Sequence, residues 1–154
     1  MRQAIDLRRK KLDSFFNRAS HGAIPEELQA DLARLGAILI CGFVERSVEL
    51  IILDRLSTRA HPRVLNFIKS YFKRGTNYDC AAMCRMLERF DVNWSNKFKR
   101  FLDSRPILNE SLDSVYTLRN SIAHGGDANR GLRGIMELHE AAVNIIDGLI
   151  ESTT

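Results

Sequence analysis

The chain has 154 residues, of which 45% are hydrophobic and 27% charged, a composition close to that of an average globular domain and far from that of a disordered chain. Lys and Arg number 23 against 19 Asp and Glu, a net charge of +4 that favours polyanions without establishing nucleic-acid binding. The longest apolar run, residues 35–44, is about half of what a bilayer span requires, and we expect no membrane anchor. Because the N-terminus lacks a secretory signal pattern, we expect a cytoplasmic protein.

Apolar residues recur every three and four positions between sparse Gly and Pro, which predicts an all-α domain. We expect a single domain over residues 1–154, an up-and-down bundle of about five to seven helices. The first helix is predicted over Arg2–Ser20 and the second from Pro25 to about Ser57. The second helix is apolar almost all the way round through its middle, as expected of a central helix. Within it, Gly36 and Gly42 are expected to allow close approach of neighbouring helices.

Five further helices are predicted towards the C-terminus. Pro62 opens the third, Asn109 is the expected N-cap of the sixth, and Gly125 supplies the left-handed stop that ends it. The expected ranges are 62 to about 74, 79–90, 94–103, 109–124 and 130–151.

One cation interrupts the apolar stripe of the predicted sixth helix. On a helical wheel Arg119 falls in the middle of that stripe, where an uncompensated charge would cost several kcal/mol. One interpretation is an internal ion pair with Glu45 or Glu49, which lie one turn apart on the second helix. The other is that the helix face opens onto a cleft or a subunit seam and presents Arg119 to an anion. Both can hold together, because a carboxylate can orient an arginine that also binds phosphate.

His124 follows at the predicted end of the same helix, with Asn120 one turn before it. The helix dipole favours the imidazolium and a nearby arginine disfavours it, a balance that suits acid–base chemistry near neutrality. The alternative interpretation is a simple capping side chain. Because Arg119 and His124 are ~140° apart on an ideal helix, either the last turn unwinds or Arg119 of one chain works beside His124 of another.

The remaining candidates for chemistry have structural interpretations. His139 interrupts the apolar stripe of the last helix, and we expect a hydrogen-bonded core histidine. Cys80 and Cys84 share a helical face without the further ligands of a zinc site, so we expect buried small side chains. There is no glycine-rich phosphate loop, metalloprotease motif or magnesium-binding carboxylate cluster. We therefore expect no cofactor and no metal.

The segment 118–125, Leu-Arg-Asn-Ser-Ile-Ala-His-Gly, contains an Arg-x4-His pattern. It lies on a predicted penultimate helix that ends in Gly-Gly, after a long apolar helix and before a final amphipathic one. In this context the chain resembles the HEPN superfamily of small all-helical domains, in the branch found in prokaryotic conflict and RNA-repair systems.

The resemblance implies a function and a set of partners. It implies a metal-independent endoribonuclease in a toxin–antitoxin or defence role, in which a homodimer forms a composite site that cuts RNA. Arg119, Asn120 and His124 match the catalytic positions, and an antitoxin or neighbouring-gene protein is a candidate partner. Antitoxin-partnered relatives often have Tyr where this chain has Gly126, so inactivation through that tyrosine is not expected here. The alternative is a non-catalytic HEPN module for dimerisation or for binding a partner or RNA.

RNA hydrolysis without a metal is chemically reasonable with these residues, because RNA carries its own 2′-hydroxyl nucleophile. In this mechanism His124 acts as general base or acid, Arg119 holds the phosphate with paired hydrogen bonds, and Asn120 orients either of them. The expected products are a 2′,3′-cyclic phosphate and a 5′-hydroxyl. DNA should be inert.

Overall fold

All regular secondary structure is helical in the residues that the computed structural model describes, 1–73, 75–126 and 130–154. This confirms the all-α prediction. The helices in these residues are α1 (Arg2–Ser20), α2 (Glu26–Leu56), α3 (Pro62–Phe72), α4 (Cys80–Phe90), α5 (Val92–Asp103), α6 (Pro106–Ala123) and α7 (Leu132–Ser152). The predicted bounds lie close to these, except at the start of α6.

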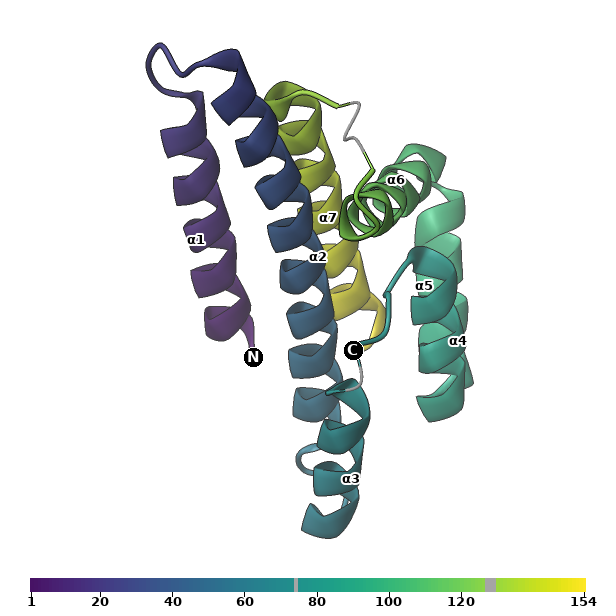
Figure 1. Cartoon of the computed structure of the whole chain (residues 1–154). Helices are drawn as coiled ribbons and strands as arrows, with labels where there is room; N and C mark the ends of the chain where they lie inside the picture. The colour runs from purple at the N-terminus through teal and green to yellow at the C-terminus, as the bar shows by residue number, and fades with distance from the viewer. Residues whose placement is uncertain (74, 127–129) are drawn as a thin grey trace.

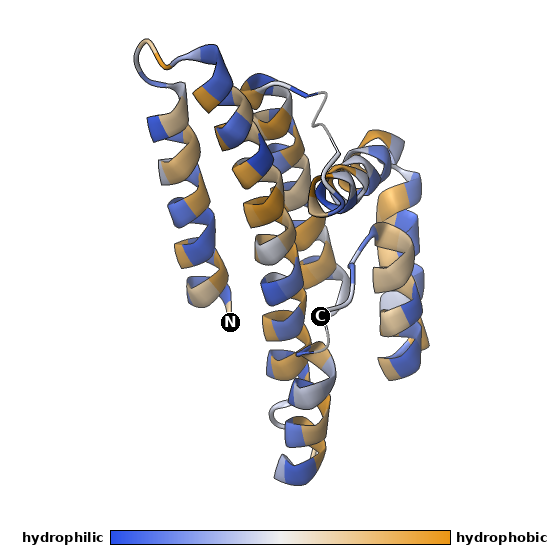
Figure 2. Ribbon diagram, in the orientation of Figure 1, coloured by the Kyte–Doolittle hydropathy of each residue, from blue (hydrophilic) through white to orange (hydrophobic). Residues whose placement is uncertain are grey.

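The long helix α2 is the centre of the bundle, as its apolar surface predicts. The helices α1 and α7 lie alongside it, and α6 crosses α2 and α7 at a steep angle (Figure 1). The pair α4 and α5 packs against α6 and α7, and α3 packs against α2. Hydrophobic residues are spread along α2 and α7, whereas hydrophilic residues recur along α1 (Figure 2). One cluster of buried apolar side chains draws on all of these helices, so the position of α6 is set by the same core as α2 and α7.

The helix ends explain where the sequence prediction succeeded and failed. Asp79 caps α4 by accepting a hydrogen bond from the Ala82 amide at 2.7 Å, and Asp91 caps α5 in the same way. The prediction that Asn109 begins α6 is wrong, because the helix starts at Pro106. Proline suits the first helical position, where its missing N–H has no partner to lose.

The two glycines of α2 differ in their surroundings. At Gly36 a Cβ would lie 2.9 Å from the ring of Phe16 and 3.1 Å from Ile135, which confirms that this glycine allows close helix packing. At Gly42 the same expectation fails within one chain, because a Cβ there would meet nothing within 4 Å. Gly42 is exposed.

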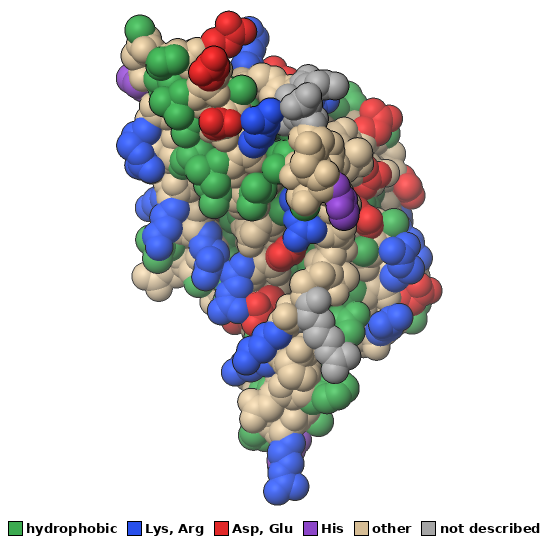
Figure 3. Space-filling model, viewed as in Figure 1, with side chains coloured by type: hydrophobic (Ala, Val, Ile, Leu, Met, Phe, Trp, Pro, Cys, Tyr) green, Lys and Arg blue, Asp and Glu red, His purple; other side chains and the backbone are tan. Residues whose placement is uncertain are grey.

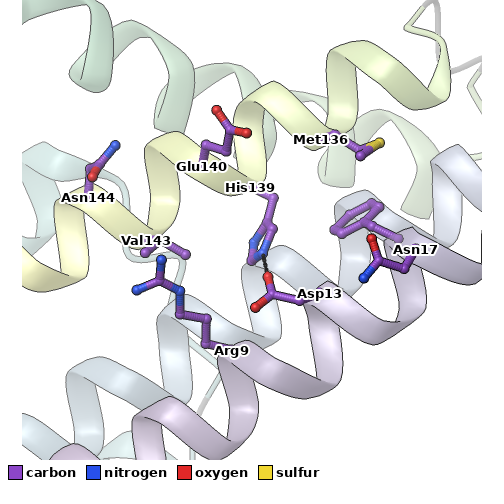
Figure 4. Close-up of a pocket in the computed structure, with 9 residues that line it drawn as sticks. Arg9, Asp13, Asn17, Met136, His139, Glu140, Val143 and Asn144 are labelled. Carbon is purple, nitrogen blue, oxygen red and sulfur yellow. Dashed lines mark hydrogen bonds and ion pairs between the residues drawn. The ribbon is translucent and has the colours of Figure 1, made fainter. Parts of the chain in front are cut away.

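His139 and the cysteines have the structural roles that the sequence indicates. His139 is buried in α7, and its Nε2 lies 2.8 Å from Asp13 Oδ1 in a groove between α1 and α7 (Figure 4). The His139 ring also packs against the ring of Phe16. The three cysteines are buried and free, and burial raises the pKa of the Cys41 and Cys80 thiols to about 12. They act as small apolar side chains.

Among the described residues, no helix has the length and apolar character needed to span a bilayer.

Replacing Gly148 by Ala should destabilise the fold by about 1–3 kcal/mol, because the added methyl overpacks the core. A Cβ at this position would lie 2.3 Å from the ring of Phe101. That ring cannot move freely, since it stacks on Phe98 and Arg105 lies over it. The matched control is Gly134→Ala in the same helix, where the Cβ would meet the movable side chain of Arg130. Urea unfolding should show a lower midpoint for the first variant only, and equal midpoints would contradict the packing argument.

Candidate functional site

The candidate site forms where the last turns of α6 meet α2 and the segment between α3 and α4. The half-buried Arg119 projects from α6, and its Nη1 donates to Asn77 Oδ1 at 3.0 Å and to Asn120 Oδ1 at 3.3 Å. Asn77 Nδ2 in turn donates to Asn120 Oδ1 at 3.4 Å. The two amides therefore hold one edge of the guanidinium in a fixed orientation.

Neutral amides hold the guanidinium without cancelling its charge. In the part of the chain that the structure describes, Nε and Nη2 of Arg119 donate to no protein atom, and no carboxylate forms an ion pair with this side chain. An oriented guanidinium with unused donors is suited to binding a phosphate or carboxylate group in a paired geometry.

Neither of the two glutamates that were expected to neutralise Arg119 forms an ion pair with it in the described residues. Glu49 forms an ion pair with Arg46 on its own helix. Glu45 is half-buried, and its Oε1 is a buried atom with no hydrogen-bond partner among the described residues. Burial raises the pKa of Glu45, while the positive charge of Arg119 opposes that rise. The carboxyl group is thus close enough to Arg119 to feel its charge without being engaged by it.

Two buried tyrosines complete the inner wall of the site. Tyr116 comes from α6, three residues before Arg119, and its hydroxyl faces the backbone of Tyr78. Burial raises the pKa of both phenols, that of Tyr78 to about 12. Both hydroxyls therefore stay protonated at neutral pH, and the negative charge of Glu45 adds to the rise in the pKa of both phenols.

His124 lies at the rim of the site. It is the C-cap residue of α6 and is exposed, and its backbone N–H still bonds to the carbonyls of Asn120 and Ser121 at 3.2 and 3.1 Å. The chain reverses only at Gly125, in the left-handed region at φ +77°. The last turn is therefore not unwound before His124. Asn120 contacts Arg119 and Asn77, not the His124 ring.

A small cavity of about 270 Å³ adjoins the amide pair. Its lining includes Asn77 and Asn120 together with the carboxylates Asp79 and Asp113. Burial, with a smaller effect from Asp79, raises the pKa of Asp113. Across the described residues, no group of three or more His, Cys, Asp or Glu side chains is placed to hold a metal ion.

Asn77 is the residue of this site that sequence analysis missed. It lies in an irregular segment just before the N-cap of α4, where asparagine is an ordinary turn residue. Nothing in the sequence pattern connects it with Arg119, which lies 42 positions further along the chain.

Comparison with known proteins assigns the chain to a family. The family model described as RiboL-PSP-HEPN matches residues 4–154. The chain belongs to the RiboL-PSP-HEPN family. No curated protein and no solved structure matches the chain. The match to RiboL-PSP-HEPN confirms the predicted HEPN superfamily and its all-helical fold, and it includes the Arg119–His124 motif. HEPN domains generally dimerise and bind RNA.

Proposed function

We propose that this protein is a metal-independent endoribonuclease whose whole chain, 1–154, acts as one HEPN domain. The observation that carries the proposal is the environment of the Arg119 side chain. Its guanidinium is half-buried and held by two amides, and its Nε and Nη2 groups are unused within the described residues. A charge kept oriented but not neutralised by the protein is suited to a phosphate that becomes more negative in the transition state.

The chemistry assigned to the site is 2′-hydroxyl transesterification. Arg119 binds the non-bridging oxygens of the scissile phosphate, and Asn120 with Asn77 keeps the guanidinium in place. His124 transfers a proton to or from one of the reacting oxygens. The 2′-oxygen forms a bond to phosphorus while the bond to the 5′-oxygen breaks, which yields a 2′,3′-cyclic phosphate and a 5′-hydroxyl.

The geometry of α6 supports a site shared between two copies of the chain. His124 follows Arg119 by five residues on a helix that stays regular to Ala123, so their side chains diverge by ~140°. Because the last turn is not unwound, one protomer does not bring the two groups onto the same face. A two-fold related copy would supply the missing imidazole.

The surface that we assign to the second copy is an exposed stripe on α2, defined by Leu28, Leu35, Ile38 and Leu39. These residues follow one another at helical spacing, and the stripe leads directly towards Gly42 and Glu45 at the edge of the site. Hydrophobic side chains gather over the N-terminal half of α2, beside basic side chains (Figure 3). A contiguous exposed apolar patch is characteristic of an interface, and its continuity with the site favours a second copy as the occupant.

Purified protein should cut labelled single-stranded RNA in the presence of EDTA, leaving 2′,3′-cyclic phosphate ends. The His124→Ala variant should lose about 10²–10⁴-fold in rate, the usual contribution of a proton-transfer group. The matched control is His21→Ala, which removes an exposed histidine at the C-cap of α1 and should leave the rate unchanged. The same RNA with a single 2′-deoxy substitution at the cut should resist cleavage. Intact RNA with wild-type protein, or equal rates for His124→Ala and wild type with unchanged helical circular dichroism, would overturn the proposal.

The second candidate function is a non-catalytic HEPN module that binds RNA or a partner protein. The exposed stripe on α2 favours it, because such a surface serves a binding module equally well. RNA binding without cleavage in the same assay would support this alternative. The biological setting that we propose, a cytoplasmic toxin–antitoxin or defence system with an antitoxin or neighbouring-gene partner, rests on the HEPN resemblance.

A further inference from the structure

We infer that the Glu45 carboxylate is the general base of this site, accepting the proton of the attacking 2′-hydroxyl, an assignment that rests on the proposed endoribonuclease function. Glu45 lies on α2 at the edge of the stripe and close to Arg119 of the same chain. The next glutamate on this face, Glu49, is held by Arg46. Glu45 has no such partner in the described residues.

The absence of a partner argues against a purely structural role. A carboxylate kept to neutralise a buried arginine forms direct charge-assisted hydrogen bonds with it, often in pairs. Here the Arg119 hydrogen bonds go to Asn77 and Asn120, and Glu45 Oε1 remains buried and unpaired among the described residues. Burying an unpaired carboxylate oxygen costs free energy. Such atoms are uncommon in folded proteins and are often found where a group has a chemical task.

Among Glu45 and the groups near it, Glu45 is the one that can accept a proton at neutral pH. Tyr116 and Arg119 face it from α6, Tyr78 from the segment before α4, and Cys41 from one turn earlier on α2. Burial raises the pKa of the thiol and of both phenols, so these stay protonated at neutral pH. An arginine side chain does not lose its proton in proteins. Burial also raises the pKa of Glu45, which brings this carboxylate closer to the range in which a general base is most effective.

The assignment divides the proton transfers between two residues. The 2′-hydroxyl gives its proton to the Glu45 carboxylate as the 2′-oxygen bonds to phosphorus. The bond from phosphorus to the 5′-oxygen breaks, and the departing oxygen takes a proton from the His124 imidazolium of the other subunit. Glu45 then releases its proton to water and His124 takes one up, so both groups return to their starting states. Glu45 and Arg119 thus form one half of each site, and His124 belongs to the other half.

The experiment measures kcat/KM against pH for Glu45→Gln, with Glu49→Gln as the matched control one turn along α2. For Glu45→Gln, which keeps the size of the side chain, we expect a loss of about 10²–10⁴-fold. The fall in rate on the acid side, which reports protonation of the base, should disappear with it. Glu49→Gln should keep both the rate and the profile. Glu45→Asp should recover part of the activity and keep the acid limb, which a merely structural role would not produce.

Mixtures of variants locate the base within the shared site. Glu45→Gln mixed with His124→Ala should recover cleavage, because the second chain contributes an intact Glu45 and Arg119 and the first contributes His124. Glu45→Gln mixed with Arg119→Ala should stay inactive, because neither chain carries both Glu45 and Arg119. Carboxyl NMR of the protein without RNA should also show Glu45 titrating above the ordinary range for glutamate. An active wild type with an unchanged Glu45→Gln profile would overturn this inference alone, whereas an inactive wild type would overturn it together with the proposed function.

Discussion

Equal amounts of Arg119→Ala and His124→Ala chains, each inactive alone, should recover about a quarter of the wild-type cleavage rate once their subunits have exchanged. Random pairing makes half of the dimers mixed, and each mixed dimer has one site with both residues and one with neither. The expectation follows from the regular last turn of α6, which directs Arg119 and His124 of one chain to different sides. Cleavage of labelled RNA in EDTA, before and after a mild unfolding and refolding of the mixture, measures it.

The control is a chain that carries both substitutions, added in excess to wild type. If the site is shared, a mixed dimer of wild type with this double variant has no complete site, so the excess should suppress cleavage. If Arg119 and His124 of one chain work together, every wild-type chain keeps its own site and the rate per wild-type chain stays constant. No recovery in the first mixture, combined with a constant rate in the second, would show that the site is not shared.

The architecture was largely predictable because it depends on local patterns. Apolar spacing located each helix of the described residues, and Asp79, Pro62 and Gly125 mark boundaries through short-range hydrogen bonds or backbone restrictions. The largest boundary error shows how two such signals compete. Asn109 has the chemistry of an N-cap, but Pro106 three residues earlier is compatible with the first turn, and α6 begins there.

The site was predictable only in part, because its decisive contacts are long-range. Arg119 was identified because a cation in an apolar stripe is visible from spacing alone. Its hydrogen-bond partner Asn77 was not identified, since that residue lies 42 positions away in an irregular segment. Likewise, spacing placed Glu45 and Glu49 on one helix face but could not tell which of them Arg46 engages. Which of several nearby groups a side chain binds depends on distances in the folded structure, and these cannot be derived from one sequence.

Replacing Ile38 by Glu should convert the proposed dimer to a monomer and remove most of the proposed cleavage activity. Ile38 is 44% exposed in one chain and lies within the stripe, next to Leu35 and Leu39. A carboxylate there would have to be buried without a partner in the interface, and we expect the dissociation constant to rise by about 100-fold or more. Sedimentation equilibrium and the EDTA cleavage assay measure the two effects on the same samples. The matched control is Ile107→Glu, which alters a 75% exposed isoleucine at the start of α6, outside the stripe, and should change neither.

The Gly42→Ala variant is a second test of this surface. We expect it to stabilise the single protomer and, where two α2 helices meet at this point, to weaken the dimer. In one chain a Cβ at this exposed mid-helix position meets nothing within 4 Å, so Gly42→Ala should stabilise the protomer by about 0.5–1 kcal/mol through helix propensity. If another α2 crosses close to this point, the same methyl separates the two helices and weakens the dimer. A higher urea midpoint together with weaker association would place the crossing at Gly42. A higher midpoint with unchanged association would place the contact elsewhere along the stripe.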